Sequence, residues 1–367
     1  MHVLITVNAA WNLLNFRRAL IAALLEDGHR VTVLAPPDAA FDELRSMGCN
    51  TVALKMDRKG LSPLRDAALM VRFLRQFRQL RPDVVLSYTI KNNVFGALAA
   101  RVVGIPFIPN VTGLGTAFLS GRVLQWVVEK LYRTAFAKVP AVFFQNGDDR
   151  DLFLKRRLVQ ENQVRLLPGS GIDLEYFSPQ EMPIEDTVSF LLIARVLRDK
   201  GVVEYAEAAA TLRQSYPHAR FLLLGPMGTE NRSAIDAATV RGWQESGALI
   251  YLGAHDDVRP QITAADCVVL PSYREGTPRS LLEAGAMARP VVATDVPGCR
   301  HVVVEGETGL LCTARDADSL RAAMQAILDM VPETRSLMGR AGRSRMEEVY
   351  DQAHVIAAYR AALAETA

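Results

Sequence analysis

The sequence predicts an α/β protein with two parallel sheets, and three observations support this. The chain has 367 residues, which is enough for two substantial cores. Short apolar runs alternate with longer amphipathic stretches from the first residue onward, as in successive βαβ units. A segment rich in glycine and proline interrupts the alternation after Pro168. We therefore expect two Rossmann-like domains whose parallel sheets face a central cleft.

The N-terminal domain is expected over residues 1–170, with helices on both faces of its sheet. Its strands are short apolar runs, predicted at His2–Val7, Arg30–Ala35, Asn50–Lys55, Asp83–Tyr88, Phe107–Val111, Ala141–Gln145 and Val164–Leu167. Amphipathic stretches predict helices at Asn12–Glu26, Pro63–Leu80 and Arg122–Ala137.

A second domain follows a linker at residues 171–187 and is expected over 188–350. Its predicted strands are Ser189–Ala194, Phe221–Gly225, Leu249–Leu252, Cys267–Pro271 and Pro290–Thr294. The tail from Glu333 to Ala367 predicts two helical segments. Whether the last of them, over residues 351–367, packs on the N-terminal domain is left open by the sequence.

The composition is that of a soluble globular enzyme, with 50% hydrophobic and 22% charged residues. Met1–Val7 forms an apolar strand followed by Asn8, which differs from a signal peptide, so a cytoplasmic protein is expected. The uncharged stretch Val102–Gly121 contains Pro106 and Pro109, which argues against a membrane-spanning helix. Any membrane contact is therefore expected to be peripheral.

Charge is distributed unevenly along the chain. Residues 1–180 contain 23 Lys and Arg against 15 Asp and Glu, whereas the remainder contains 19 against 25. A basic first half and an acidic second half indicate different partners. The four cysteines are widely spaced and form no C-x-x-C pair, so neither a zinc site nor a disulfide framework is indicated.

The segment from Ala265 to Gly298 is the most informative for function. A predicted strand runs into a polar loop at Ser272–Pro278 and then into a helix at Arg279–Ala288. Glu275 lies in the loop and Glu283 on the helix, with the spacing E-x7-E. The start of the helix offers free backbone N–H groups and a positive dipole end, which suit a diphosphate. A bare E-x7-E also fits a solvated loop acid and a solvated helix acid.

A second segment, ARVLRDKG at Ala194–Gly201, follows the first strand of the second domain. It places Arg195 and Lys200 at the strand's carboxyl end. Two cations beside a phosphate-binding helix can neutralise a departing diphosphate. Taken alone, the same cations would be ordinary surface charges at the start of a helix.

With these segments in place, the chain resembles the GT4 family of retaining glycosyltransferases, which have the two-domain GT-B fold. The matching pieces occur in family order across most of the second domain: LLIARVLRDKG, RFLLLG, IYLGAHDDV, ADCVVLPSYREGTPRSLLEAGAMARPVVATDVPG and EGETGLL. Agreement of five ordered segments is far more specific than any single one.

The resemblance implies a nucleotide-diphosphate-sugar donor held by the second domain, and it assigns roles to particular residues. Arg195 and Lys200 correspond to the diphosphate-binding pair, Glu283 to the ribose-binding acid and Glu275 to the acid beside the donor sugar. The remaining donor contacts that it implies are Gly276, Thr277, Pro278, Ser280, Leu281, Gly225, Leu252 and His255.

The first domain is similar to a subgroup acting on undecaprenyl-diphosphate-linked sugars, including the enzyme that adds N-acetylgalactosamine to the diacetylbacillosamine lipid. The shared pieces are NLLNFRRALI, SYTIKNN and VTGLG. They suggest Asn15, Lys91 and Asn92 as acceptor-binding residues, although Lys91 and Asn92 also fit a simple loop. The acceptor-domain His of many relatives is missing from NVTGLGTAF.

Gly113 and Gly115 in VTGLG follow a predicted strand, so they could approach donor phosphates. A nicotinamide-binding G-x-G-x-x-G is the competing interpretation, but Phe118 occupies its third glycine position. No cofactor is expected.

Two acidic pairs raise the question of a metal site. Asp149 with Asp151 and Asp316 with Asp318 lie where acids complement helix N-termini, so no metal is predicted.

The resemblance implies transfer of a sugar, an N-acetylhexosamine from its UDP form, to a polyprenyl-diphosphate-linked saccharide, with anomeric retention. The alternatives are a UDP-sugar 2-epimerase of the same fold and a non-catalytic nucleotide-sugar-binding subunit. No nucleic-acid partner is expected.

A peripheral location on the inner face of the cell membrane is expected from the predicted helix Pro63–Leu80. Leu64 and Val71 fall among its arginines Arg65, Arg72, Arg75 and Arg78, as in interfacial helices. A solvated basic face is the competing interpretation of the same pattern.

Overall fold

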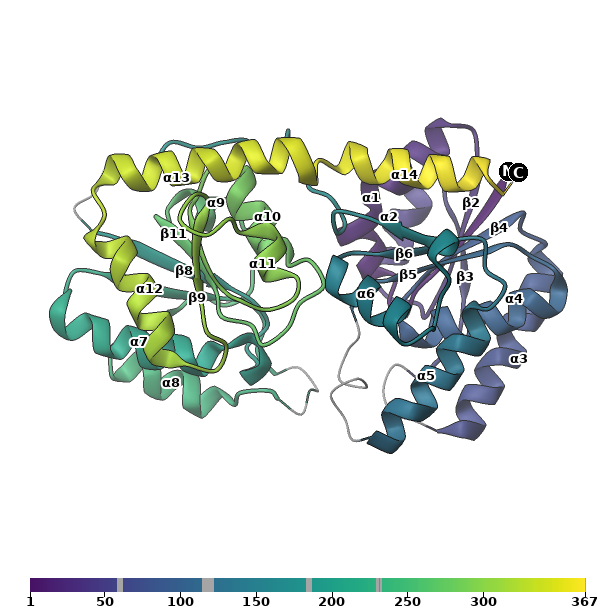
Figure 1. Cartoon of the computed structure of the whole chain (residues 1–367), viewed down its shortest axis with the longest axis horizontal. Helices are drawn as coiled ribbons and strands as arrows, with labels where there is room; N and C mark the ends of the chain where they lie inside the picture. Colours follow the sequence, from purple (N-terminus) through teal and green to yellow (C-terminus); the bar gives the residue numbers. More distant parts are fainter. Residues whose placement is uncertain (58–61, 114–121, 183–186, 229–230, 232, 367) are drawn as a thin grey trace. The chain divides into compact units, whose positions relative to one another are not determined.

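The structure, a computed structural model, describes residues 1–57, 62–113, 122–182, 187–228, 231 and 233–366. Within these residues the chain forms two compact units (Figure 1). Unit 1 comprises Met1–Gly171 and Gln352–Ala367, and unit 2 comprises Ile172–Asp351. The chain therefore passes twice between the units.

Unit 1 is built on a parallel sheet that has seven strands in the described part of the chain, in the order β3-β2-β1-β4-β5-β6-β7. Its strands are β1 (His2–Thr6), β2 (Arg30–Ala35), β3 (Asn50–Ala53), β4 (Val84–Tyr88), β5 (Phe107–Val111), β6 (Val142–Phe144) and β7 (Val164–Leu166). Each lies within a predicted apolar run. Burial on both faces explains why the central runs are almost continuously apolar, whereas the edge strands β3 and β7 contain no buried residue.

Helices cover both faces of this sheet. They are α1 (Trp11–Glu26), α2 (Ala40–Ser46), α3 (Pro63–Leu80), α4 (Ala97–Val103), α5 (Arg122–Phe136), α6 (Gly147–Lys155) and α14 (Gln352–Ala364), with a π-helical turn η1 (Asn92–Gly96) and a 3₁₀ turn η3 (Glu161–Gln163). One core cluster joins the sheet to α1, α2 and α14. The other joins it to the layer formed by α3, α4, α5 and α6.

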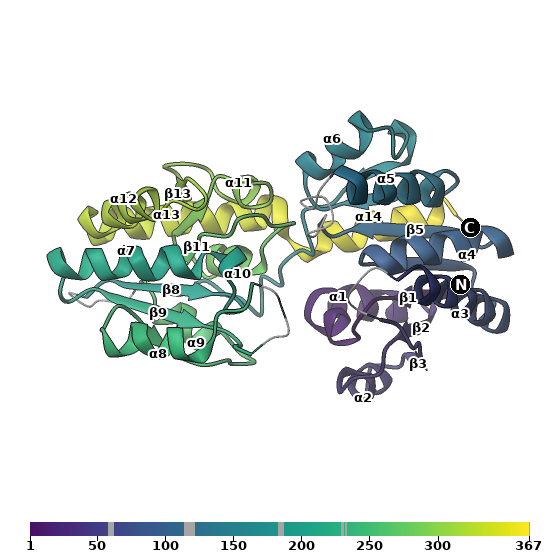
Figure 2. The same ribbon diagram turned by 90° about the horizontal axis from the view of Figure 1, so that it is seen from below.

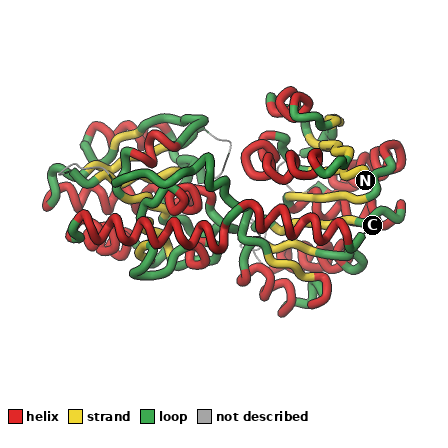
Figure 3. The backbone as a smooth tube through the Cα atoms, turned by 90° about the horizontal axis from the view of Figure 1, so that it is seen from above, coloured by secondary structure: helices red, strands yellow, loops and turns green. Residues whose placement is uncertain are grey.

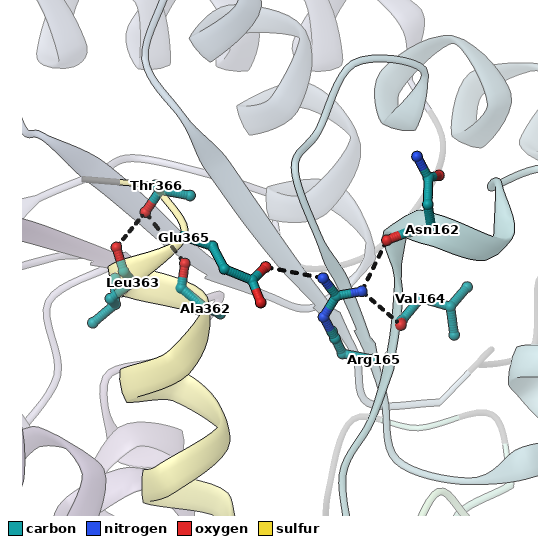
Figure 4. Close-up of polar contacts among 7 residues, drawn as sticks. All are labelled: Asn162, Val164, Arg165, Ala362, Leu363, Glu365 and Thr366. Carbon is teal, nitrogen blue, oxygen red and sulfur yellow. Dashed lines mark hydrogen bonds and ion pairs between the residues drawn. The ribbon is translucent and has the colours of Figure 1, made fainter.

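The C-terminal helix α14 answers the question that the sequence left open, because it packs on unit 1. Val355 and Tyr359 are buried in the core with α1 and the sheet. At the end of the helix, Arg165 Nη2 lies 2.9 Å from Glu365 Oε2, and Arg165 also donates to the carbonyls of Asn162 and Val164 (Figure 4). These contacts fasten the end of the chain beside β7.

Unit 2 has a parallel sheet with six strands among its described residues, in the order β10-β9-β8-β11-β12-β13. Its strands are β8 (Ser189–Ile193), β9 (Arg220–Leu224), β10 (Ile250–Tyr251), β11 (Cys267–Leu270), β12 (Val291–Thr294) and β13 (Gly309–Cys312). The edge strand β13 is not among the predicted strands. Helices again lie on both sides of the strands (Figures 2 and 3).

The helices of unit 2 are α7 (Val202–Ser215), α8 (Ala237–Glu245), α9 (Arg259–Thr263), α10 (Arg279–Ala286), α11 (Cys299–Val302), α12 (Ala317–Asp329) and α13 (Pro332–Arg345), with short turns η4 (Arg198–Lys200) and η5 (Met346–Tyr350). The helix predicted to reach Ala288 ends at Ala286. Ala288 has a φ of 57°, a left-handed conformation that cannot continue an α-helix.

Candidate functional site

The order of strands in unit 2 determines where a ligand can bind. β8 and β11 are neighbours although they are far apart in sequence, and the chain continues from them toward opposite sides of the sheet. Ligands of open parallel sheets bind beyond the carboxyl ends of strands at such a switch point. Arg195 and Lys200 follow β8, and Ser272–Pro278 follow β11. The two predicted segments therefore meet at one sheet edge.

Direct contacts join these two loops. Lys200 Nζ forms an ion pair with Glu275 Oε1, and the side chains are only 20% and 13% exposed. The backbone N–H of Tyr273 donates to the Asp199 carbonyl at 3.0 Å. The pair thus places a cation and a carboxylate, predicted separately from sequence, in contact at the switch point.

The segment after β12 packs against the loop that carries Glu275 and supports it. The Glu275 N–H donates to the Pro297 carbonyl at 3.2 Å. Gly298 has a φ of +88°, and a Cβ on it would lie 2.6 Å from the carbonyl oxygens of Glu275 and Gly276. Only glycine allows this close approach without displacement of the loop. Gly298 was not predicted as a site residue.

Tyr273 is a second supporting residue that the sequence did not single out. Its hydroxyl donates to Glu204 Oε1 at 2.6 Å, and the Arg315 guanidinium lies 4.6 Å from its ring centroid. Burial raises the pKa of this phenol to about 12, helped by the hydrogen bond to Glu204. These contacts hold the loop after β11 against α7.

α10 begins directly after the loop, with Pro278 in extended conformation at its N-cap. Gly276, Thr277 and Ser280 are partly exposed around this helix start. The Leu281 side chain instead lies in the core, so only its backbone remains for the predicted donor contact. The N-terminal N–H groups and the helix dipole favour an anion at this point.

Glu283 lies on α10, where it is 8% exposed. The Arg279 Nε donates to Glu283 Oε1 at 2.7 Å, one helical turn away. Burial raises the pKa of Glu283 above its ordinary value, and the Arg279 cation opposes this shift. A carboxylate already paired with one cation keeps its second oxygen as an acceptor for ligand hydroxyls.

Arg195 differs from Lys200 in being exposed. No group in the described part of the chain forms an ion pair or side-chain hydrogen bond with its guanidinium. Gly225 lies beside it: a Cβ on Gly225, whose φ is +145°, would lie 1.9 Å from the Ala194 carbonyl oxygen. Gly225 therefore has a packing reason for being glycine, in addition to its predicted place near the base.

The other predicted base contacts lie after β10. The Leu252 N–H donates to the Leu223 carbonyl at 2.8 Å and extends the pairing of β9 with β10. His255 is exposed, with Nε2 3.1 Å from the Leu252 carbonyl. Both residues thus lie at the carboxyl edge of β10.

The predicted acceptor residues of unit 1 are already engaged in internal contacts. Lys91 Nζ lies 2.8 Å from Asp66 Oδ1, and these side chains are 15% and 11% exposed. Asn92 is fully buried and donates to Thr6 Oγ1 at 2.7 Å. Asn15 donates to the Trp11 carbonyl within α1. The structure therefore supplies a structural role for each, and acceptor binding remains a prediction.

Gly113 follows β5 with a φ of +144°, while Gly115 and Phe118 lie outside the described residues. Three of the four acids lie at helix starts as expected, whereas Asp151 lies in the second turn of α6, where it pairs with Arg150. Asp316 caps α12 by accepting from the Ser319 N–H at 2.9 Å, and Asp149 lies in the first turn of α6. Over the described ranges, no group of three His, Cys, Asp or Glu side chains could hold a metal ion.

Solved structures confirm the predicted fold. The chain aligns over its full length with sucrose-phosphate synthase from Thermosynechococcus elongatus, covering 98% of that chain at 20% identity and a TM-score of 0.80. It also aligns with Anabaena HepE in complex with UDP, covering 100% of each chain at 16% identity and a TM-score of 0.81. Two Rossmann-like units with parallel sheets are thus the fold of GT-B glycosyltransferases.

Sequence relatives include enzymes of lipid-linked saccharides. The N,N'-diacetylbacillosaminyl-diphospho-undecaprenol α-1,3-N-acetylgalactosaminyltransferase of Campylobacter jejuni is 29% identical over 339 residues, 88% of each chain. The UDP-Gal:α-D-GlcNAc-diphosphoundecaprenol α-1,3-galactosyltransferase of Escherichia coli is 23% identical, over 74% of this chain and 73% of that protein.

Two family profiles match the two units in turn. The profile described as glycosyl transferase 4-like domain matches residues 15–169, and the one described as glycosyl transferases group 1 matches residues 187–330. Together they span most of both units, including every loop at the β8 and β11 edge. The chain is a glycosyltransferase, and it belongs to the group 1 family with a 4-like N-terminal domain.

Proposed function

We propose that this glycosyltransferase moves an N-acetylhexosamine from a UDP-sugar to a polyprenyl-diphosphate-linked saccharide, with retention at the anomeric carbon. The observation that carries the donor assignment is the arrangement at the β8 and β11 edge. There the Lys200–Glu275 pair, the start of α10 and buried Glu283 lie at one switch point. Lys200 and the start of α10 would bind the diphosphate, Glu275 would lie beside the sugar and Glu283 would bind the ribose.

The acceptor assignment draws on the relatives. The Campylobacter jejuni and Escherichia coli proteins act on undecaprenyl-diphosphate-linked sugars, as their names state, and the former transfers N-acetylgalactosamine. The former covers 88% of this chain, so the likeness extends over both units.

The mechanism follows from the charges at the donor edge. Arg195, Lys200 and the N-terminus of α10 would stabilise the negative charge that develops on the departing UDP. Glu275, held by Lys200, would lie beside the donor sugar. Glu283 would accept hydrogen bonds from the ribose hydroxyls. The acceptor hydroxyl would attack from the face that UDP leaves, and a donor phosphate oxygen would take its proton, which gives retention.

A mass-spectrometric assay tests this function. The full chain is incubated with UDP-GlcNAc, UDP-GalNAc, UDP-glucose or UDP-galactose and a short polyprenyl-diphosphate saccharide, and the lipid product is weighed. We expect an increase of one N-acetylhexosamine that persists in EDTA. A UDP-sugar epimer formed without acceptor would instead identify an epimerase, and absence of both products with tight UDP binding would identify a binding subunit.

A lipid-linked acceptor implies a membrane partner, and we assign α3 as the docking helix. Its Leu64 and Val71 are 85% and 63% exposed, although Leu69, Phe73 and Phe77 of the same helix are buried. Exposed Arg75 and Arg78 follow Val71 by about one and two helical turns. An open hollow of about 480 Å³ on this helix is lined by Val71, Leu74, Arg75, Arg78 and Gln79.

An exposed aromatic side chain, Trp126, lies on α5, in the same helical layer as α3. Trp126 is 61% exposed, and Lys130 Nζ lies 5.7 Å from its ring centroid. Apolar groups among cations are typical of helices that lie in a membrane interface. None of the helices in the described ranges is long and apolar enough to span a bilayer. We therefore propose peripheral binding to the anionic inner face of the cell membrane.

A further inference from the structure

One cation of unit 1 is buried without a counter-charge. Arg17 on α1 is only 4% exposed. Its Nη1 donates to the Phe16 carbonyl at 2.8 Å, and its guanidinium lies 4.8 Å from the ring centroid of Tyr88. Its Nε is buried without a hydrogen-bond partner, and no carboxylate of the described residues forms an ion pair with it. Burial of an unpaired charge is costly, so such a residue calls for an explanation.

The groups around Arg17 also have unused hydrogen-bonding capacity. Tyr88 on β4 and Asn110 on β5 are register partners in the sheet. Asn110 Oδ1 is buried without a partner. The Tyr88 hydroxyl lies beside the Tyr359 hydroxyl and the Arg17 guanidinium but forms no hydrogen bond of normal geometry with either. Asn110 Nδ2 donates to the Tyr359 hydroxyl of α14 at 2.8 Å, which fixes the amide. Because buried polar groups in proteins are almost always bonded, the unpartnered Arg17 Nε and Asn110 Oδ1 in one cluster indicate a missing partner.

The cluster lies where ligands of parallel sheets bind. Tyr88 is the last residue of β4, and Asn110 is next to last in β5. β4 is the neighbour of β1 at the switch point of unit 1, the counterpart of the β8 and β11 edge in unit 2. A guanidinium and a phenol hydroxyl donate to phosphate oxygens, whereas an amide oxygen accepts from a sugar hydroxyl.

We propose that Arg17, Tyr88 and Asn110 bind the diphosphate and first sugar of the acceptor, with Arg17 and Tyr88 donating to phosphate oxygens. The proposal rests on the proposed function for the identity of the acceptor. Protein atoms cover the three groups in the structure, so binding requires the Arg17 side chain to turn toward the sheet edge. That movement breaks the hydrogen bond to the Phe16 carbonyl and the contact with the Tyr88 ring, but it breaks no ion pair.

Calorimetry with geranyl diphosphate, a short soluble prenyl diphosphate, tests this site. Saturating UDP is present throughout, so that the donor site is occupied. In the Arg17→Met variant we expect the Kd for geranyl diphosphate to rise at least tenfold. Arg18→Met is the matched control, because Arg18 is the next residue of α1 but is exposed and paired with Glu43. It should bind as the wild-type chain does.

Thermal unfolding separates a binding role from a structural one. Removing an unpaired buried charge should leave the unfolding temperature of Arg17→Met equal to that of the wild-type chain, or raise it. A lower unfolding temperature with unchanged geranyl diphosphate affinity overturns the proposal, as does a wild-type chain that shows no binding at millimolar concentration. If Arg17→Met does not fold, Arg17→Lys decides: weaker binding supports the site, and wild-type affinity overturns it.

A UDP titration distinguishes the two diphosphates that Arg17 could meet. We expect unchanged UDP affinity in Arg17→Met, whereas a tenfold loss would place Arg17 at the donor and overturn the acceptor assignment. Neither titration needs turnover. Failure of sugar transfer with Arg17-dependent binding intact would therefore remove the proposed function alone, and transfer with Arg17-independent binding would remove this inference alone.

Discussion

Units 1 and 2 use the same sheet edge in different ways. In each, a lysine follows a strand at the switch point and pairs with a carboxylate: Lys200 with Glu275 in unit 2, and Lys91 with Asp66 in unit 1. The two pairs are similarly buried. Lys200 joins two loops of the edge, whereas Lys91 joins the edge to helix α3.

Pairing and burial alone therefore do not distinguish the two lysines. Glu275 lies in a loop that meets solvent and has partly exposed neighbours in Gly276 and Thr277. Asp66 instead lies in the first turn of α3 and is 8% exposed. We therefore expect Lys200 to act in chemistry and Lys91 in stability, and each can be tested against the other.

The largest effect is expected from Lys91→Ala, on folding. Removing one partner of a buried pair leaves the Asp66 carboxylate without compensation, which costs about 3–5 kcal/mol. Urea unfolding should show this loss, and the folded fraction should keep its turnover. The double variant Lys91→Met with Asp66→Leu should recover much of the stability. A stable Lys91→Ala protein with a raised KM for the acceptor would instead support the acceptor role predicted from sequence.

Lys200→Ala should act on turnover. Removing one preorganised donor to a developing negative charge commonly lowers kcat about 10²–10³-fold. We expect a loss of this order in single-turnover rate at saturating donor, with a smaller change in donor affinity. Arg198→Ala, an exposed cation in the same loop, is the matched control. A wild-type single-turnover rate in Lys200→Ala would show that the unit 2 pair is also structural.

Glu283→Ala should weaken donor binding. Loss of a charged acceptor costs about 1.5–3 kcal/mol, so the Kd for UDP should rise at least tenfold in calorimetry. The pH dependence has a definite sign. Burial raises the pKa of Glu283, so the carboxylate takes up a proton at higher pH than an exposed glutamate, and UDP affinity should fall as pH falls through that value. Glu283→Gln should lack this titration, and unchanged UDP binding in Glu283→Ala would remove the ribose role.

The central strands that the sequence predicts have apolar runs buried on both faces, whereas the edge strands β3, β7 and β10 were also predicted although none of their residues is buried. β13 has four residues, as many as β11 and β12, but it begins with Gly309 and was not predicted. A Cβ there would lie 2.2 Å from the Val291 carbonyl oxygen, so the glycine is required by the close approach of β12. Gly309 therefore indicates a turn in the sequence, but in the structure it is a strand residue at which a larger side chain would clash with β12.

That the two segments meet at the β8 and β11 edge was predictable, because their cations and acids each follow a strand. The supports of this edge were not, since they depend on contacts between distant segments. Gly298 lies under Glu275, and the Tyr273 hydroxyl reaches Glu204, 69 residues away. In unit 1 the paired Lys91 and Asp66 are also separated in sequence, by 25 residues. The Pro297–Gly298 dipeptide was the one local signal, since such pairs mark turns.

The smallest effect is expected from single arginines of α3. Each cation near an anionic membrane contributes about 1 kcal/mol, so Arg75→Ala should weaken vesicle binding about fivefold. Arg72→Ala should act less, because the Arg72 guanidinium already donates to the Lys55 carbonyl at 2.9 Å. Arg241→Ala, on α8 of unit 2, is the control and should bind as the wild-type chain does. Co-sedimentation with vesicles containing anionic lipid, at low and high salt, measures these differences.

Removing Arg72, Arg75 and Arg78 together should abolish the salt-sensitive part of binding. If this triple variant sediments like the wild-type chain, or if neither shows salt-sensitive binding, then α3 is a solvated surface and the basic character of unit 1 serves another partner.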